Sequence, residues 1–345
     1  MGNTHVSLKD LARELQVSIS SVSRALNNHP DISPDLVKRV QKLAQQWNYK
    51  PNPYAMRLLK HVSKTIGVII PDIATYFYAS VISGIESYTK EKGYAVVISS
   101  SQELCQKEQD NIENLLNLRV DGLIICLSQE TSSYSHFDKI IEAKTPLVFF
   151  DRVCRTGEFS SVVADNYEAA RMVIKHFHEM GAKKIAFING PAHLNICKER
   201  FSGYIEGLKD CGLKIRKDFL ISCNMTPESA KLATQKLLAL PEIPDAILSI
   251  NDTVAFAAMK EIKFQGIKIP DKIALVGFTD EFHASIVDPE LTSVMHPTFE
   301  MGQEAARLLI NQIESDEQKT PRQIVMKTKL VIRKSSIKNN KYATT

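Results

Sequence analysis

Several patterns that would indicate catalysis or metal binding are missing from this sequence. Its six cysteines are scattered and form no C-x-x-C pair, so neither a zinc site nor a redox dithiol is indicated. The signatures H-E-x-x-H, G-x-S-x-G, G-x-x-x-x-G-K and G-x-G-x-x-G are also absent. We therefore expect a protein that is not an enzyme and that uses no metal and no cofactor.

The sequence also shows no apolar leader near its start and no apolar run long enough to span a bilayer. Cysteines among apolar neighbours, such as Cys126 in LIICL, are typical of buried, reduced thiols. These features predict a cytoplasmic protein without a membrane partner. Its 345 residues, 44% of them hydrophobic and 24% charged, are ordinary for a globular chain of two or three domains.

Positive charge is concentrated at the start of the chain. Residues 1–60 carry nine Lys and Arg against four Asp and Glu, a net charge of +5. The other residues carry 34 basic against 35 acidic side chains, so the excess of +4 comes from this segment. A basic head on a nearly neutral body indicates a polyanion as the partner of the head. The alternative is a solvated basic face without a partner.

The first fifty residues predict three short helices. The stretch LKDLARELQVSISSVSRALN, residues 8–27, reads as two helices joined by a turn at Gln16-Val17, a helix-turn-helix. Ser7 and Ser18 are good N-caps for these helices, and Ser33-Pro34-Asp35 indicates the start of a third. We expect residues 1–50 to form a DNA-binding head. The alternative is a small helical bundle whose second helix is incidentally rich in serine.

The outward side of the second helix carries residue types that contact DNA. Small hydroxyls near a helix N-terminus can hydrogen-bond phosphate oxygens. An arginine can reach a guanine edge or a phosphate, and an isoleucine can touch a thymine methyl group. The outward residues are Ile19, Ser20, Ser21, Ser23, Arg24 and Asn27.

A hinge is expected over residues 51–64. Pro51 and Pro53 end the third helix, and Asn52 can cap a new short helix that runs to Leu59. So short a helix is marginal alone in water. We therefore expect it to fold only on DNA, beside its symmetry mate.

Residues 65–335 alternate between short apolar runs and helical patterns. Runs such as 65–71 and 122–127 read as buried strands, and 78–92 and 134–143 as helices. The alternation predicts an α/β fold of doubly wound parallel sheets. It occurs in two series, which predicts two lobes with crossovers near 164 and 293 and a return near 325. Residues 336–345 are then a basic tail without the apolar heptads of a coiled coil.

Polar residues follow the predicted strands, at the place where ligands bind in open α/β sheets. Repeated polar strand endings favour a cleft for a carbohydrate or a nucleoside, because planar polar groups can grip its hydroxyls. The alternative for single acids such as Asp165 and Asp252 is that each caps a helix. The strand-end residues are Asp72, Ser100, Ser101, Ser128, Asp151, Arg152, Asn189, Asn224, Asn251, Asp252, Thr279 and Asp280.

The stretches SLKDLARELQVSISSVSRALNNHPDIS and WNYKPNPYAMRLL strongly resemble the headpiece of LacI-family bacterial transcription regulators. TIGVIIPDI, PLVFFDR, SINDTVAFAAM and LTSVMHP also resemble that family, in the right order over about residues 6–335. The resemblance implies a helix-turn-helix head, a hinge helix and a two-lobed, periplasmic-binding-protein-like body. Gln16 departs from the many members that have Gly in the turn. A left-handed backbone there would strain Gln by about 1 kcal/mol.

The resemblance also implies roles in DNA binding. Ile19 and Ser20 match the base-reading pair, and Arg24 matches a basic contact. Leu58 matches the wedge that enters the minor groove, and Ala55 allows the close approach. Ser7 matches a phosphate contact, and the residues that match backbone-positioning contacts are Ser18, Ser21, Ser23 and Asn27. We also expect Asn52, the predicted cap of the hinge helix, among the residues that bind DNA.

For the body, the resemblance implies an effector site. Phe77 and Tyr78 match its aromatic wall, and Met225 lies where some members stack an aromatic ring. We expect Arg200 and Asp252 to be the central pair. The full set of expected effector contacts, with Arg152 added from the strand endings, is Phe77, Tyr78, Ser128, Asp151, Arg152, Asp165, Arg200, Met225 and Asp252.

The sequence thus predicts a homodimeric regulator of transcription, expected to be a repressor, that reads a pseudo-palindromic operator. A small effector, a sugar or a sugar derivative, would control its DNA affinity. One alternative is a nucleoside-responsive or purine-responsive regulator on the same body. A second is a cytoplasmic sugar-binding protein or a sugar-modifying enzyme, which the basic head and the absence of catalytic motifs disfavour.

Overall fold

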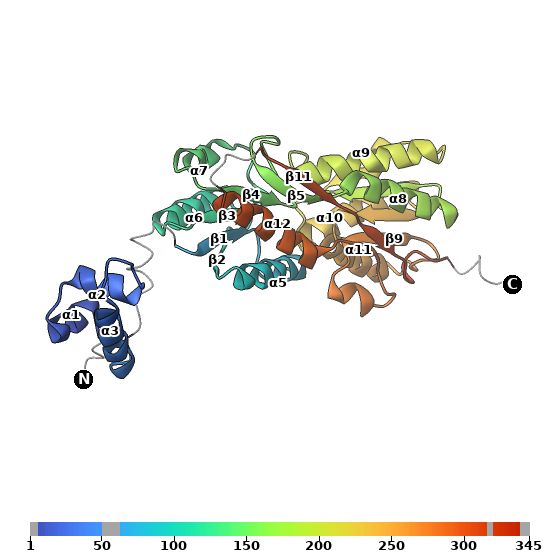
Figure 1. Cartoon of the computed structure of the whole chain (residues 1–345). Helices are drawn as coiled ribbons and strands as arrows, with labels where there is room; N and C mark the ends of the chain where they lie inside the picture. Colours follow the sequence, from blue (N-terminus) through green and yellow to red (C-terminus); the bar gives the residue numbers. More distant parts are fainter. Residues whose placement is uncertain (1–5, 50–62, 316–319, 339–345) are drawn as a thin grey trace. The chain divides into compact units, whose positions relative to one another are not determined.

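The computed structural model describes residues 6–49, 63–315 and 320–338. The chain divides into two compact units, Met1–Ser63 and Lys64–Thr345 (Figure 1). The predicted hinge residues Asn52, Ala55 and Leu58 lie outside the described residues.

Three helices form the first unit around a small apolar core. Ser7 and Asp10 make a complete capping box, in which each side chain accepts a hydrogen bond from the other residue's N–H. Gln16 follows the first helix with φ 54° and ψ 40°, the left-handed conformation of the turn. Ser18 caps the second helix by accepting from the N–H of Ser21 at 3.0 Å. The predicted helix-turn-helix is confirmed. Its helices are α1 (Leu8–Leu15), α2 (Ile19–Leu26) and α3 (Pro34–Gln46), and its buried residues are Leu11, Ala12, Val22, Ala25, Val40 and Ala44.

The second unit contains two six-stranded sheets, each flanked by helices (Figure 1). We call each sheet with its helices a lobe. In the first lobe the strand order is β11-β5-β4-β3-β1-β2, and all pairings are parallel. Its strands are β1 (Thr65–Ile70), β2 (Ala95–Ser100), β3 (Gly122–Ile125), β4 (Leu147–Phe150), β5 (Ser160–Ala164) and β11 (Gln323–Met326). Its helices are α5 (Tyr76–Glu91), α6 (Cys105–Asn117), α7 (Asp138–Glu142) and α12 (Thr298–Ile313).

Helices cover both faces of this sheet because its strands are apolar on both sides. Along β1, Ile66 and Val68 belong to the cluster formed with α5 and α12, whereas Ile69 belongs to the cluster formed with α6 and α7. Alternate residues of a strand point to opposite faces, so a strand buried on both faces reads as a continuous apolar run.

The second lobe repeats this plan with the order β12-β10-β9-β8-β6-β7. All pairings are parallel except the antiparallel pairing of β10 with β12. Its strands are β6 (Ile185–Asn189), β7 (Leu220–Ser222), β8 (Ala246–Ser249), β9 (Ala274–Thr279), β10 (Thr292–Met295) and β12 (Lys329–Val331). Its helices are α8 (Asn166–Glu179), α9 (Asn195–Asp210), α10 (Pro227–Leu238) and α11 (Asp252–Phe264). Short 3-10 helices lie at Ser135–Phe137 in the first lobe and at Lys217–Phe219 and Phe282–Ser285 in the second.

The chain passes between the lobes three times, between β5 and α8, between β10 and α12, and between β11 and β12. Helix α12 packs closely along α5 (Figure 1). Gly84 makes this approach possible, because a Cβ there would lie 2.0 Å from the carbonyl oxygen of Phe299. The predicted α/β fold with doubly wound, largely parallel sheets is confirmed.

Some elements differ from the sequence prediction. Residues 134–143, predicted as one helix, form the 3-10 helix Ser135–Phe137 and then the short α7. Strands β5, β10 and β11 are too short and too polar, with the sequences SSVVA, TSVM and QIVM, to stand out as apolar runs. None of the described helices has the length and apolar character that crossing a bilayer requires.

Candidate functional site

The exposed side of α2 holds the predicted DNA contacts of the head. Ile19 is 48% exposed, and Ser20, Arg24 and Asn27 are exposed as well. Arg24 lies 4.0 Å from the exposed carboxylate of Asp31, and an ion pair of this kind contributes little free energy in water. The Arg24 guanidinium can therefore leave Asp31 for a DNA partner at low cost.

Hydroxyl groups cluster at the start of α2. The Oγ of Ser18 lies 2.7 Å from the Oγ of Ser20 and 2.8 Å from that of Ser21. Such a cluster at a helix N-terminus suits a phosphate oxygen, because the helix dipole and the hydroxyls point to the same place. The hydroxyl of Ser7 instead donates to Asp10 at 2.6 Å, and the amide of Asn27 donates to the carbonyl of half-buried Ser23.

The body contains a cavity of about 270 Å³ to which both lobes contribute. It lies where the carboxyl ends of the parallel strands meet, the usual ligand position in α/β sheets. Its first-lobe lining is Asp72, Thr75, Phe77, Tyr78, Glu103, Gln129, Asp151 and Arg152. Its second-lobe lining is Ile196, Arg200, Asn224, Met225, Thr226, Pro227, Ile250, Asn251, Thr253, Thr279 and Glu281.

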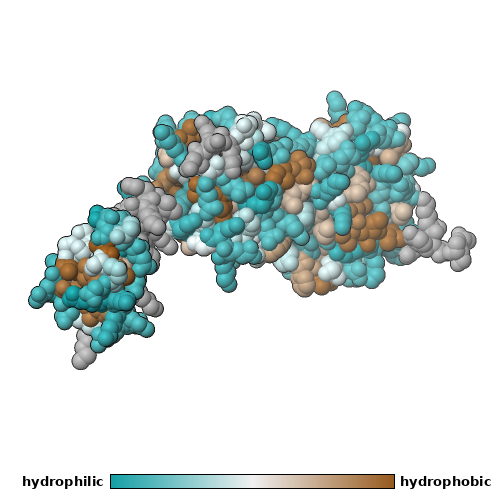
Figure 2. Space-filling view, viewed as in Figure 1, coloured by the Kyte–Doolittle hydropathy of each residue, from teal (hydrophilic) through white to brown (hydrophobic). Residues whose placement is uncertain are grey.

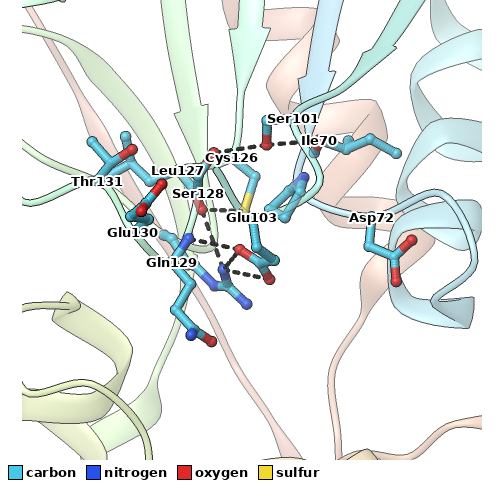
Figure 3. A network of polar contacts seen from close by, with 12 residues as sticks. Ile70, Asp72, Ser101, Glu103, Cys126, Leu127, Ser128, Gln129, Glu130 and Thr131 are labelled. Carbon is cyan, nitrogen blue, oxygen red and sulfur yellow. Dashed lines mark hydrogen bonds and ion pairs between the residues drawn. The ribbon is translucent and has the colours of Figure 1, made fainter. Parts of the chain in front are cut away.

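Arg152 is held rigidly at the first-lobe wall. Its Nη1 donates to both carboxylate oxygens of Glu103, at 2.7 and 3.0 Å. Glu103 also accepts from the backbone N–H of Gln129 (Figure 3). Burial disfavours its charge, but Tyr78 and Glu103 outweigh burial and hold the pKa of Arg152 well above its usual value. The guanidinium therefore stays charged, and its charge is balanced by Glu103.

Asp151 from the first lobe and Arg200 from the second line the same cavity, and their charges interact. Burial raises the pKa of Asp151, and the charge of Arg200 opposes that rise. The Asp151 carboxylate has no hydrogen-bond partner among the described residues, although the residue is only 6% exposed. An acceptor that is buried at a cavity without a partner is available to a ligand hydroxyl or amine.

Arg200 is anchored on several sides. Its Nε donates to the Asn166 side chain at 2.9 Å, its Nη1 donates to the carbonyl of Ile250, and its guanidinium lies 4.2 Å from the ring centroid of Phe278. Burial lowers the pKa of Arg200, and the charge of Asp151 opposes that effect. The nearby His296 is neutral, because burial lowers its pKa to about 3. Its position at 3.4 Å from Nη2 allows the imidazole to accept a hydrogen bond.

Six predicted effector residues line the cavity, and three do not. The six are Phe77, Tyr78, Asp151, Arg152, Arg200 and Met225. Ser128 is fully buried, and its hydroxyl donates to the Glu108 carboxylate at 2.8 Å. Asp165 caps α8 by accepting from the N–H of Glu168, so the helix-cap alternative describes its contacts.

Asp252 lies beneath the cavity wall, and it has no contact with Arg200. One oxygen accepts from the Ser293 hydroxyl at 2.6 Å, and the other accepts from the backbone N–H of Glu281 at 2.8 Å. Of the two residues expected to be central to effector binding, Arg200 therefore lines the cavity and Asp252 does not. The preceding residue, Asn251, both lines the cavity and caps α11.

The sequence reasoning missed two carboxylates of the lining, Glu103 and Glu281. Each lies in a loop two or three residues beyond the end of a strand, in contrast to the residues directly at the strand ends. In the sequence, the one signal for Glu103 and Glu281 is that they lie shortly after a predicted strand. Within the described ranges, no group of three or more His, Cys, Asp or Glu is arranged to hold a metal ion.

Comparisons with known proteins match this arrangement over almost the whole chain. Residues 7–52 match the family model described as bacterial regulatory proteins, lacI family. Residues 63–334 match the model of periplasmic binding proteins and sugar binding domain of LacI family. The HTH-type transcriptional repressor CytR of Escherichia coli strain K12 is 32% identical over 314 residues, which cover 90% of this chain and 91% of that protein.

Solved structures show the same similarity. The lac repressor dimer bound to operator and the anti-inducer ONPF has a TM-score of 0.81 and 25% identity, over 97% of this chain and 100% of that one. A complex of the transcriptional regulator CelR with cellobiose has a TM-score of 0.73 and 26% identity, over 96% and 99% of the two chains. The similarity thus includes both the head and the body.

Proposed function

The chain belongs to the LacI family of bacterial regulatory proteins, and from this premise we propose how its two units act together. The protein is a sequence-specific DNA-binding regulator of transcription, not an enzyme. Its head binds operator DNA, and its body binds a small effector that changes the operator affinity. The two sites are then coupled by a free energy that each ligand exerts on the other. CytR is named a repressor, and we propose the same role here.

The observation that carries this proposal is the shared cavity of the body. Asp151 comes from the first lobe and Arg200 from the second, and both are buried at the cavity. A ligand that contacts both residues must respond to the distance between the lobes. Binding energy is thereby converted into a preference for one arrangement of the lobes.

The charges at the cavity support an effector without negative charge. The lining contains four carboxylates, of Asp72, Glu103, Asp151 and Glu281, but only two guanidinium groups. Glu103 balances Arg152, and Arg200 is held by neutral acceptors beside Asp151. A phosphate would therefore meet an excess of negative charge, whereas hydroxyl groups could donate to the carboxylates.

We propose that the effector is an uncharged sugar, with an uncharged nucleoside as the second candidate. The CelR structure contains cellobiose, which favours a carbohydrate. The cavity of about 270 Å³ is near the lower end of typical ligand pockets, which suits a ligand of one or two rings. Phe77 and Met225 supply apolar surface for a ring face.

Thermal shift and titration calorimetry with matched ligand pairs test the effector class. The panel contains D-ribose, cellobiose and adenosine together with ribose 5-phosphate, cellobiose phosphate and AMP. We expect an uncharged member to raise the melting temperature, because a ligand that binds only the folded state stabilises it. Arg200→Ala should abolish that shift. Binding of phosphorylated members alone would contradict the charge argument.

Operator binding is tested with duplexes selected by the wild-type chain from a random pool. Arg24→Ala should weaken binding and reduce its salt dependence, because one charged contact is lost. Leu58→Ala should weaken binding without changing the salt dependence if Leu58 is the minor-groove wedge. Arg307→Ala is the matched control, because its exposed guanidinium pairs with Glu304 on α12 in the body. Absence of any selected duplex would refute the DNA-binding function.

We propose the domain division 1–50 for the head, 51–64 for the hinge, 65–335 for the body and 336–345 for the tail. The division of the chain into two compact units, with the boundary after Ser63, supports this proposal. The hinge residues Asn52, Ala55 and Leu58 are proposed as DNA contacts, Ala55 and Leu58 from the family resemblance and Asn52 from its place at the start of the hinge helix. A regulator of bacterial transcription acts on the chromosome, so we place the protein in the cytoplasm.

A homodimer on a pseudo-palindromic operator is proposed as the active form. The lac repressor structure is a dimer on its operator. The second lobe of this chain exposes apolar side chains around the end of α11, with Phe264 at 81%, Phe282 at 59% and Ile286 at 61% exposure. Figure 2 shows apolar patches on the body near α11 and β9, within a mostly hydrophilic surface. A second copy covering these side chains would remove them from water.

A further inference from the structure

Two side chains of the second lobe hold backbone groups of the first lobe. Asn195 lies at the first position of α9, and its amide makes two contacts. Its Oδ1 accepts from the N–H of Val153 at 3.0 Å, and its Nδ2 donates to the carbonyl of Asp151 at 3.1 Å. The Nε2 of His193 lies 2.7 Å from the carbonyl oxygen of Gln129. A carbonyl oxygen can only accept, so His193 Nε2 carries the hydrogen in this contact.

These contacts join the lobes beside the effector cavity without being part of its lining. Asp151 and Gln129 line the cavity, while their backbone carbonyls bind Asn195 and His193. The peptide that carries Asp151 is therefore fixed from the other lobe. Any change in the distance between the lobes must break or stretch these bonds.

The segment that carries the two side chains is itself well ordered by local bonds. Asn189, at the end of β6, accepts from the N–H of Gly190 at 2.8 Å and donates to the carbonyl of Cys197 at 3.2 Å. Leu194, between His193 and Asn195, is 2% exposed and packs in the second-lobe core. The two polar side chains thus project from a fixed base.

The receiving segment has an unusual backbone. Asp151 has φ 55°, a left-handed conformation that strains a residue with a side chain. Its N–H donates to the carbonyl of Val162 within the first lobe, and its carbonyl accepts from Asn195. Bonds on both sides of this residue hold a conformation that directs its carboxylate toward the cavity.

We propose that His193 and Asn195 form a clamp between the lobes that sets their closure and thereby tunes the coupling of effector to operator. The proposal rests on the proposed function, because it gives the two-lobed body its regulatory role. The clamp stabilises the arrangement of the lobes in this structure, and its two side chains lie outside the cavity lining. Weakening it lowers the population of the arrangement that binds effector, so the apparent dissociation constant rises by the same factor.

Hydrogen exchange in the full-length protein tests whether the clamp forms. The Val153 N–H is bonded across the lobes, so Asn195→Ala should speed exchange in the peptide 151–154 by about tenfold or more. Asn195→Asp can still accept from Val153 but cannot donate to Asp151, so its effect should be smaller. If Asn195→Ala does not fold, hydrogen exchange in Asn195→Asp tests the clamp in its place. Ser202→Ala is the control, because this exposed residue of α9 bonds only the Lys198 carbonyl.

Operator affinity tests whether the clamp regulates. With the duplex selected by the wild-type chain, Asn195→Ala and His193→Ala should each change the dissociation constant at least threefold relative to Ser202→Ala. Unchanged exchange at 151–154 in Asn195→Ala would show that the clamp does not form. Faster exchange with operator affinity equal to the control would show that it forms without regulating, and would overturn the proposal. If no duplex is selected at all, the DNA-binding function fails, and the regulatory role of the clamp fails with it, while exchange still reports the contact.

Discussion

Replacing Asp252 with asparagine separates the charge of this buried side chain from its hydrogen bonds. Asp252 is fully buried and accepts from the Ser293 hydroxyl at 2.6 Å and from the Glu281 N–H at 2.8 Å. An asparagine of the same shape can accept from Glu281 through its oxygen and donate to Ser293 through its NH₂ group. The substitution Asp252→Asn should therefore preserve the packing and remove only the titration.

The pKa of Asp252 sets the size and sign of the effect. Burial raises it from its ordinary value of 3.8 to about 8. Between those values the unfolded chain has lost the proton that the folded chain keeps, so the free energy of unfolding falls as pH rises. A shift of this size corresponds to at most about 5 to 6 kcal/mol. We expect at least about 2 kcal/mol, because local relaxation and water entry reduce the cost of a buried ion.

Urea unfolding of the wild type and of Asp252→Asn between pH 5 and pH 9 measures this difference. At pH 5 both folded proteins carry a neutral group at residue 252, although Asp252 is already ionised in the unfolded wild type, so the difference between the two proteins is smallest at this end of the range. The free energy of unfolding of the variant should then rise relative to that of the wild type up to about pH 8. The difference between the two proteins should stay constant above that pH. Asp165→Asn makes the same chemical change at the partly exposed cap of α8. A difference that is flat with pH, or that shrinks as pH rises, would refute this account of Asp252.

Three further substitutions test other parts of the structure. Gly84→Ala should lower the free energy of unfolding, measured with urea, by more than about 2 kcal/mol, because its Cβ would meet the Phe299 carbonyl at 2.0 Å. Gly93→Ala is the control: this residue has φ 73° and open space around it, so the substitution should lower the free energy of unfolding by only about 1 kcal/mol. Gln16→Gly should stabilise the head by about 0.5 to 1 kcal/mol in the same assay, because glycine adopts φ 54° without strain. Arg200→Lys keeps the charge but loses the planar donors, so calorimetry should show at least tenfold weaker effector binding with operator binding retained.

The head could be predicted closely because its structure depends on neighbours in the sequence. The capping serines, Ser7 and Ser18, bond residues three positions further on, as the sequence pattern requires. The left-handed turn at Gln16 was expected from the family resemblance, although glutamine does not favour it. Local signals of this kind need no knowledge of the rest of the fold.

The cavity could be predicted only as a region, because its lining depends on contacts between distant segments. Strand endings indicate one edge of each sheet, but they do not say which of two adjacent residues faces the ligand. Asn251 is extended, with φ −154°, and faces the cavity, whereas Asp252 begins α11 and points beneath the wall. Glu103 and Glu281 enter the lining from loops, whose paths are set by bonds that the sequence pattern does not reveal.

The position of Asp252 suggests why a costly buried acid stands next to the cavity. The last residue of β9, Thr279, and a residue of the loop that follows, Glu281, both line the cavity, and Asp252 accepts hydrogen bonds from both. An apolar residue at 252 would remove the buried acid but leave the Glu281 N–H and the Ser293 hydroxyl without their acceptor, at a cost of about 1 to 3 kcal/mol each. Asp252 therefore lowers the free energy of unfolding at neutral and higher pH, but it holds the loop after β9 in place. Because Asp252 holds Thr279 and Glu281 in place, we expect Asp252→Asn to leave effector binding nearly intact and Asp252→Ala to weaken it.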